Sequence, residues 1–189
     1  MVKRTAPAPV SPTDVVYSCA ISLDGYIAAA DGGVDWLNSA MVKGESYDLP
    51  EFQRSIDGIL MGSRTYEQAI EMGGMMGGRI HTWVFSKRAL PSRQGVTITS
   101  ASPAEIVKAL PGHGVRRAWL MGGGLLAASF LEQGLLDEIG LAIMPVVLGS
   151  GIPLFGSMKS CVSLRLIESK TYKGGAIGLR YAPVRSKRP

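Results

Sequence analysis

Strand-like and helix-like runs alternate along the first two thirds of the chain, and this alternation constrains the fold more than any other feature. Val15–Ser22 ("VVYSCAIS") is rich in apolar and β-favouring residues and stops at Asp24-Gly25, which is typical of a buried strand. Further strand signals lie at 58–62, 81–87, 95–100 and 116–122, and helix signals lie at 49–57, 63–72, 102–110 and 125–133. Such alternation favours parallel strands joined by helical crossovers.

The last third of the chain changes to strands that follow one another without helices. Residues 137–149, 162–172 and 176–184 have strand character, and the last two are joined by "KGG", a hairpin signal. Earlier, Ser102, Pro103 and Glu105 form a predicted capping box at a helix start. We therefore predict an α/β fold with a mostly parallel central sheet, antiparallel C-terminal edge strands and helices on both faces.

The chain has 189 residues, which is enough for one well-packed domain and too few for two. We expect the domain at 14–183, between a disordered tail at 1–13 and a basic tail at 184–189. Five of the 20 basic residues lie in these tails, which hold no acid, so the body carries 15 residues of each sign. A neutral body is not expected to bind nucleic acid, because such binding needs a basic patch on the fold.

Several other classes of protein are not expected from this sequence. No apolar run approaches the roughly 20 residues of a membrane span, and the basic N-terminus lacks the apolar segment of a secretory signal. Cys19 and Cys161 are far apart, and His81 and His113 are isolated, so we expect no metal site. Unpaired cysteines fit a reducing, cytoplasmic setting.

Two strand-to-helix junctions are suited to phosphate. At Gly62, Ser63, Arg64 and Thr65, two hydroxyls and a guanidinium accompany the free N–H groups of a helix start. At Gly122, Gly123 and Gly124, the absence of Cβ atoms lets a pyrophosphate approach the main chain and the following helix. The alternatives are an N-cap by Ser63 or Thr65 with Arg64 in solvent, and tight packing at the glycines.

A third strand end, "FSKRAL", carries Ser86, Lys87 and Arg88, which suit a ribose phosphate; the alternative is a solvated basic strand end. The sequence contains no Gly-x-Ser-x-Gly elbow, no histidine paired by spacing with a nucleophile and no carboxylate cluster for a metal. If the protein is an enzyme, an organic cofactor is therefore the natural carrier of its reaction.

Five segments in order resemble the dihydrofolate reductase-like superfamily across roughly residues 14–182. They are "AISLDGYIA" (Ala20–Ala28), "ILMGSRTYE" (Ile59–Glu67), "VFSK" (Val84–Lys87), "MGGGLLAASFLEQGLLDEI" (Met121–Ile139) and "PVVLGSGIPLF" (Pro145–Phe155). The branch they resemble most is the C-terminal reductase domain of bacterial riboflavin-biosynthesis deaminase-reductases and its stand-alone relatives. The resemblance implies a dihydrofolate reductase-like three-layer α/β/α fold, NADPH as hydride donor and often a homodimer, for which the apolar 141–149 run offers a face.

The resemblance also implies roles for individual residues. Ser63, Arg64 and Thr65 would hold phosphates after Gly62, while Ser86, Lys87 and Arg88 would lie near the adenosine ribose and its 2′-phosphate. The pyrophosphate and nicotinamide ribose would contact Met121, Gly122, Gly123, Gly124 and Leu125, and Ala20 and Ile27 would flank the nicotinamide. The substrate would face Ser22, Asp24, Trp36, Leu148, Gly149, Ser150 and Gly151.

For catalysis we expect Asp24 or Asp48, or water, to supply a proton to the reduced substrate. Asp48 lies near the position of the acidic residue that holds the pterin in dihydrofolate reductases, but the later strand reads "GLAIM" where many of them carry a threonine. The riboflavin reductases carry a longer "GTV…D.P.L..R" segment where this chain has "GSRTYE". The expected function is thus reduction of a small heterocycle or imine, with a pterin reductase or a non-catalytic nucleotide-binding homodimer as alternatives.

Overall fold

The computed structural model describes residues 12–73, 80–91 and 93–184. Most of both predicted tails lies outside these residues, but Thr13 is buried and donates a hydrogen bond to the carbonyl of Val115, so it belongs to the body. The elements in chain order are β1 (Asp14–Ser22), β2 (Tyr26–Ala28), α1 (Asp35–Ala40), α2 (Leu49–Ser55), β3 (Gly58–Gly62), α3 (Ser63–Glu71), β4 (Thr82–Phe85), β5 (Val96–Thr99), α4 (Pro103–Ala109), β6 (Arg117–Gly122), α5 (Gly124–Glu132), β7 (Glu138–Met144), β8 (Ile152–Pro153), β9 (Leu164–Thr171) and β10 (Ile177–Pro183).

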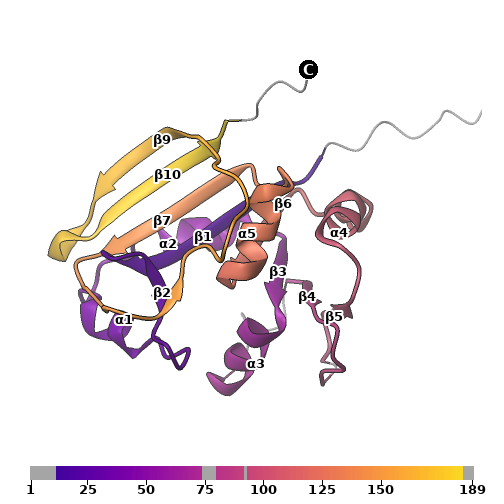
Figure 1. Ribbon diagram of the computed structural model, residues 1–189, viewed down its shortest axis with the longest axis horizontal. Coiled ribbons are helices and arrows are strands. Elements are labelled where there is room, and N and C mark those ends of the chain that lie inside the picture. Colours follow the sequence, from indigo (N-terminus) through magenta and orange to yellow (C-terminus); the bar gives the residue numbers. More distant parts are fainter. Residues whose placement is uncertain (1–11, 74–79, 92, 185–189) are drawn as a thin grey trace, which may run out of the picture.

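One eight-stranded sheet runs through the molecule in the order β5-β4-β3-β6-β1-β7-β10-β9 (Figure 1). The six strands from β5 to β7 are parallel, and β10 and β9 continue the sheet in antiparallel fashion. The hairpin predicted at "KGG" joins β9 to β10, because Gly174 and Gly175 take the positive φ that this turn requires. The predicted mixed sheet is confirmed.

Helices cover both faces of the sheet, because successive side chains of each strand point to opposite sides. Leu60, Leu120 and Tyr17 pack in one core with Phe130 of α5 and Leu110 after α4. Ile59, Met61 and Val84 pack in a second core with Tyr66 of α3 and Phe52 of α2. The predicted three layers are therefore present, with α4 and α5 on one face and α2 and α3 on the other.

The structure differs from the expected elements in three places. The predicted strand 137–149 ends at Met144, and both edges of β7 are paired within the sheet, with β1 and β10; the expected homodimer stays a prediction. Residues 35–40, for which no element was predicted, form α1. The short strands β2 and β8 pair with each other in a separate sheet, a tertiary contact that local pattern does not encode.

The predicted start of α4 is observed with the hydrogen bonds that its sequence implies. Ser102 accepts a hydrogen bond from the backbone N–H of Glu105, and the Glu105 side chain accepts one from Ser102 in return, so the capping box is confirmed. None of the helices in the described part of the chain is long and apolar enough to cross a bilayer.

Candidate active site

The three strand ends that were predicted to bind phosphate, at Gly62, Ser86 and Gly122, lie side by side at the carboxyl edge of the sheet. In the β3–β4 ladder Gly62 is opposite Phe85, which precedes Ser86, and in the β3–β6 ladder Met61 is opposite Gly122. A Cβ atom built on Gly62 would lie 3.7 Å from the Gly122 carbonyl oxygen. Segments separated by about 60 residues in sequence therefore form one surface, as expected for a ligand that spans several strands.

Two helices point their N-termini at this surface. Both α3 and α5 begin after a glycine, Gly62 and Gly123, and neither has a side-chain cap. The alternative N-cap by Ser63 or Thr65 is thus not observed, and the first N–H groups of both helices are available to an anion. The Thr65 hydroxyl lies 3.6 Å from a Cβ built on Gly123, so it belongs to the same surface.

The glycines of this surface are there for different physical reasons. Gly122 has φ +122°, a conformation that L side chains rarely adopt. Gly124 packs so closely against the carbonyls of Pro153 and Leu154 that a Cβ atom would collide with backbone. Gly123 has an ordinary φ of −87°, and a Cβ there would meet only the Thr65 hydroxyl. Packing therefore explains Gly124, backbone conformation explains Gly122, and the space beside Gly123 is open except for the Thr65 hydroxyl.

The basic residues predicted for phosphate differ in their availability. Arg88 forms an ion pair with Glu67 of α3, 2.9 Å between Nη2 and Oε2, and its backbone N–H donates to the Ser86 hydroxyl. Among the described residues, Arg64 and Lys87 have no acidic partner. A phosphate at this edge would thus meet Arg64 and Lys87 as free cations, whereas Arg88 is already neutralised.

A cavity of about 540 Å³ lies on the α2 side of the sheet. Its floor is a row of small residues in register across neighbouring strands: Ala20 of β1 is opposite Ala142 of β7, which is opposite Gly178 of β10. A second row, Ser18 and Gly140, lies two residues away on the same strand faces. Because these side chains are short, the sheet face stays flat and open where larger residues would fill it.

The walls of the cavity are apolar and aromatic side chains. Leu37 and Met41 come from α1 and its end, Leu49 and Phe52 from α2, and Trp119 from β6. The Phe52 and Trp119 rings meet edge to face with centroids 5.3 Å apart. The three strand ends at 62–65, 86–88 and 122–124 are called the glycine surface below. Trp119 of the cavity lies close to this surface, because Gly122 follows three residues later on the same strand, about 10 Å away.

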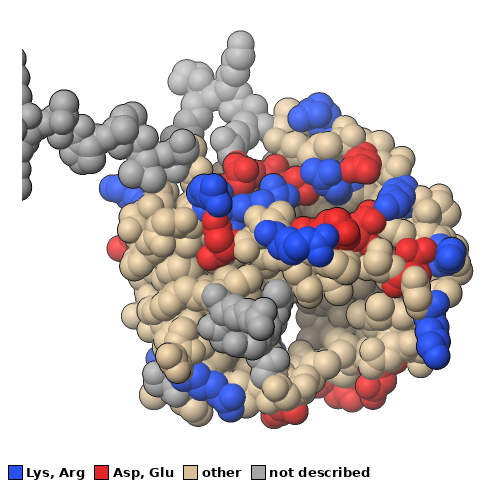
Figure 2. Space-filling view, turned by 180° about the vertical axis from the view of Figure 1, so that it is seen from behind, with Lys and Arg blue, Asp and Glu red and all other residues tan. Residues whose placement is uncertain are grey.

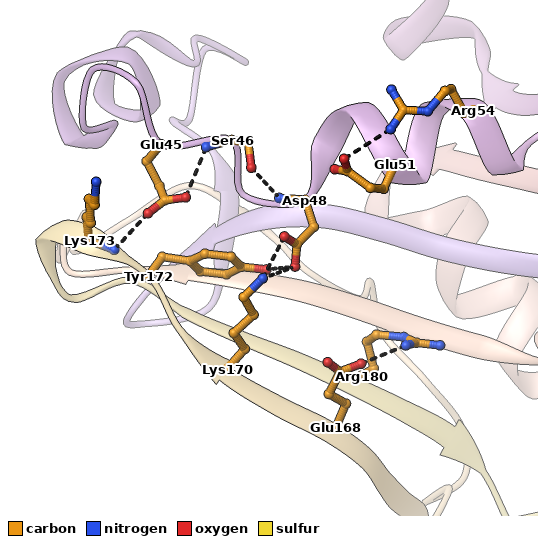
Figure 3. A network of polar contacts seen from close by, with 10 residues as sticks. All are labelled: Glu45, Ser46, Asp48, Glu51, Arg54, Glu168, Lys170, Tyr172, Lys173 and Arg180. Atoms are coloured by element: carbon orange, nitrogen blue, oxygen red, sulfur yellow. Dashed lines mark hydrogen bonds and ion pairs between the residues drawn. The ribbon is translucent and has the colours of Figure 1, made fainter.

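One end of the cavity carries the Asp48 carboxylate. It accepts hydrogen bonds from the Lys170 ammonium at 2.6 Å and from the Tyr172 hydroxyl at 3.0 Å (Figure 3). Tyr47 and Asp48 both have positive φ, at 52° and 56°, so the chain turns sharply to place this carboxylate at the start of α2.

The pKa values in this cluster determine which groups hold protons. The Lys170 hydrogen bond lowers the pKa of Asp48, and the same contact raises the pKa of Lys170. Burial and the Asp48 hydrogen bond raise the pKa of Tyr172 to about 12. The Asp48 carboxylate is therefore stabilised in its ionised form, whereas Lys170 and Tyr172 both hold protons at the cavity. The expected role of Asp48 in supplying a proton stays a prediction.

The other end of the cavity holds a network of two arginines and two glutamates. Arg180 donates to Glu138 at 2.8 Å and to Glu168 at 2.7 Å, and Arg117 lies 3.4 Å from Glu138. The Glu138 side chain is only 14% exposed. On the face seen in Figure 2, acidic and basic side chains alternate along a band that borders a hollow with a mostly uncharged surface.

Asp24 does not line the cavity, and its carboxylate binds the backbone of a loop instead. Its carboxylate accepts hydrogen bonds from the Ser22 hydroxyl and from the backbone N–H groups of Leu148 and Gly149. The Ser22 hydrogen bond is the main reason that the pKa of Asp24 is lowered, so this carboxyl group is also ionised near neutral pH. Asp24 therefore anchors the segment after β7, and its expected role as a proton donor stays a prediction.

None of the other residues predicted to face the substrate lines the cavity. Ser22 is fully buried, and Gly151 packs against the backbone of Ala28 in the small β2–β8 sheet. Trp36 in α1, Ser150 and the Leu148–Gly149 turn lie outside the lining, as does Ile27 of β2. Their contact with a ligand stays a prediction, while Ala20 is a predicted residue that the cavity does include.

Comparisons with known proteins identify the family of the chain and its fold. The family model described as the RibD C-terminal domain matches residues 75–177. The chain belongs to this family. It is 31% identical over 164 residues to the uncharacterized protein YwjB of Bacillus subtilis, covering 86% of this chain and 93% of the relative. It is also 28% identical to RibD of Mycobacterium tuberculosis, over 73% of this chain and 44% of that protein.

Solved structures show the same RibD reductase-like fold. A riboflavin biosynthesis protein of Shewanella sp. PV-4 superposes with a TM-score of 0.81 at 27% identity, covering 92% of this chain and 99% of that chain. The deaminase/5-amino-6-(5-phosphoribosylamino)uracil reductase of Thermotoga maritima superposes with a TM-score of 0.70 at 16% identity, and this chain spans 57% of its length. The second likeness concerns the fold alone.

Sequence reasoning identified the strand ends but missed most of the cavity. Lys170, Tyr172 and Arg180 lie near the end of the chain, more than 115 residues after the Asp48 loop. The small residues Ser18, Ala20, Gly140, Ala142 and Gly178 at alternate strand positions were a signal for an open sheet face. Their register becomes visible only when β1, β7 and β10 are paired.

Proposed function

We propose that the protein is an NADPH-dependent reductase of a small heterocyclic or imine compound. The cofactor would lie along the glycine surface, with Ser63, Thr65 and the N-termini of α3 and α5 at its phosphates. The single observation that supports this most is the position of the cavity, whose lining includes Trp119 of β6, three residues before Gly122 in the glycine surface. A hydride donor and its acceptor need this proximity.

The residues present fit such a cofactor. Two uncapped helix starts, the Thr65 hydroxyl and the space beside Gly123 form a cradle for a pyrophosphate. Bound NADPH would supply the hydride. The chain's own part is to hold the acceptor flat against Ala20 and Ala142, to keep water out with α1 and α2, and to hold protons at Lys170 and Tyr172.

Titration with NADPH tests the cofactor directly. We expect NADPH to raise the melting temperature and the nicotinamide fluorescence, because binding to the folded state alone stabilises it. If neither changes at millimolar NADPH, the cofactor assignment fails. If NADPH binds but no pterin, flavin precursor or imine is reduced, the protein is a nucleotide-binding member of the fold.

Gly123→Ala should weaken NADPH binding by about tenfold or more while the free energy of unfolding changes by less than about 1 kcal/mol. The added methyl group meets only the Thr65 hydroxyl of the protein and so occupies space assigned to the ligand. Calorimetric titration and urea unfolding measure the two effects. Equal NADPH affinity in the variant and the parent protein would place the cofactor elsewhere.

Arg64→Ala separates two roles for this guanidinium. If Arg64 contacts the 2′-phosphate, its loss should weaken NADPH binding by about tenfold to a hundredfold and leave NADH binding unchanged, because a charged hydrogen bond is worth about 1.5–3 kcal/mol. If it contacts the pyrophosphate, both cofactors lose equally. Arg88→Ala is the matched control, since Arg88 is paired with Glu67 and its removal should alter neither affinity much.

A further inference from the structure

The order of the strands determines where the adenosine half of an extended cofactor would lie. The cavity includes Trp119 of β6 and extends from there over β1 and β7. If the nicotinamide reaches this cavity and the pyrophosphate lies between the starts of α3 and α5, the adenosine half continues away from the cavity. The next strand in that direction is β4, and the residues after its end are Ser86, Lys87 and Arg88.

Arg88 at this strand end is held by a carboxylate of α3. Its Nη2 donates to both carboxylate oxygens of Glu67, at 2.9 and 3.2 Å. Glu67 follows Ser63 by one turn on the same face of α3, so the pair lies at the border of the glycine surface. The hydroxyl of the buried Tyr66 donates to the Pro91 carbonyl at 2.9 Å. The loop after β4 is therefore fixed to α3 at two points, which keeps Arg88 beside Glu67.

The other groups of this strand end leave a single free cation. The Ser86 hydroxyl donates to the Arg88 carbonyl at 2.8 Å and accepts from the Arg88 N–H at 3.0 Å, so its proton is used within the turn. Lys87 is exposed and forms no ion pair among the described residues. A 2′-phosphate placed here would meet one free ammonium group and one guanidinium group that Glu67 already neutralises.

We infer that Glu67 limits the preference of this protein for NADPH over NADH, and that it does so by holding Arg88. This inference rests on the proposed function, since it concerns the cofactor of that reductase. The pair is accessible to a ligand, because the Arg88 and Glu67 side chains are 63% and 39% exposed. A 2′-phosphate gains Arg88 only by displacing the carboxylate, so the net gain is the difference between two charged hydrogen bonds. Glu67 is thus a positioning residue that acts through Arg88.

Glu67→Gln tests this inference, because it removes the charge that holds Arg88 and keeps the size of the side chain. We expect the ratio of the Kd for NADH to the Kd for NADPH to rise about tenfold, near the lower end of what a charged hydrogen bond contributes, since the site is exposed. Tighter NADPH binding should account for the rise, with NADH binding unchanged. Titration calorimetry with both nucleotides measures the ratio, and a ratio equal to that of the parent protein overturns the inference.

Two further variants separate the proposed route from a general effect of charge. Arg88→Ala added to Glu67→Gln should return the ratio to the parent value, because the gain requires the freed guanidinium. A gain that persists without Arg88 would overturn the inference. Glu71→Gln makes the same change one turn later on α3 and should leave the ratio unchanged. An equal rise in Glu71→Gln would assign the effect to net charge and would also overturn the inference.

The same titrations distinguish failure of this inference from failure of the proposed function. If neither nucleotide binds the parent protein or the Glu67→Gln variant, the cofactor assignment fails and the inference fails with it. If both nucleotides bind and the ratio is constant across the variants, the cofactor assignment stands and the inference alone fails. Urea unfolding of each variant checks that it is folded, and we expect little change in the midpoint because exposed ion pairs contribute little to stability.

Discussion

Gly124→Ala is expected to destabilise the protein by about 3 kcal/mol and lower the melting temperature by about 6–12 °C. The added Cβ atom would collide with the carbonyl of Pro153 and lie 3.2 Å from that of Leu154. These are backbone atoms in a segment that is held in place, because the Gly156 N–H donates to the Gly124 carbonyl and the Tyr17 hydroxyl donates to the Leu154 carbonyl. These carbonyl groups therefore cannot move away from the added methyl group without breaking hydrogen bonds.

Urea unfolding of Gly124→Ala beside Gly123→Ala gives the sharpest comparison. The two variants add the same methyl group at neighbouring positions, so differences in helix propensity and hydrophobicity are small. We expect the first to lose stability and the second to lose cofactor affinity. A similar loss of stability in both variants would contradict the distinct roles assigned to these glycines.

Glu138→Gln is expected to lower the free energy of unfolding by about 2 kcal/mol at pH 7. The amide keeps the shape but leaves Arg117 and Arg180 without the charge that compensates them, and breaking a buried ion pair costs several kcal/mol. The half-exposed position of Arg180 reduces this value, because solvent screens its charge. Chemical denaturation of parent and variant measures the difference.

The same variant should lose its effect in acid. Burial opposes ionisation of Glu138, but the hydrogen bond from Arg180 and the charge of Arg117 prevail, so its pKa is lowered in the folded protein. Such a group stabilises the fold above its unfolded pKa, near 4.5, and this contribution is lost as the pH falls through the lower folded value. The gap between parent and variant should therefore begin to narrow once the pH falls below about 4.5 and continue to narrow as the pH falls further. A gap that does not narrow in acid would show that Glu138 acts through packing.

Much of the fold followed from local pattern. Runs with strand character alternate with runs with helix character, and this alternation predicted the parallel part of the sheet. The "KGG" tripeptide predicted the C-terminal hairpin. The failures share one cause. The β2–β8 pair and the end of β7 at Met144 depend on contacts between distant segments, and Pro145 to Gly149 remain apolar although they form a loop held by Asp24.

The glycine surface illustrates what sequence alone determined. Glycines, hydroxyls and cations at strand ends were recognisable one junction at a time, and the parallel order of β4, β3 and β6 then requires them to meet at one edge. The reason for each glycine was not recognisable. Gly122, Gly123 and Gly124 look alike in the sequence, and only the folded structure shows that Gly122 has an unusual backbone conformation, Gly123 borders open space and Gly124 makes a tight packing contact.

The cavity shows what only the tertiary structure decided. Its floor combines short side chains from β1, β7 and β10, and its charged ends join Asp48 to Lys170 and Glu138 to Arg180, across separations of 122 and 42 residues. Sequence determined which strands form and which ends suit phosphate, because those depend on neighbouring residues. The register between strands decided where the sheet stays open and which charges cancel, because these depend on residues that meet only after folding.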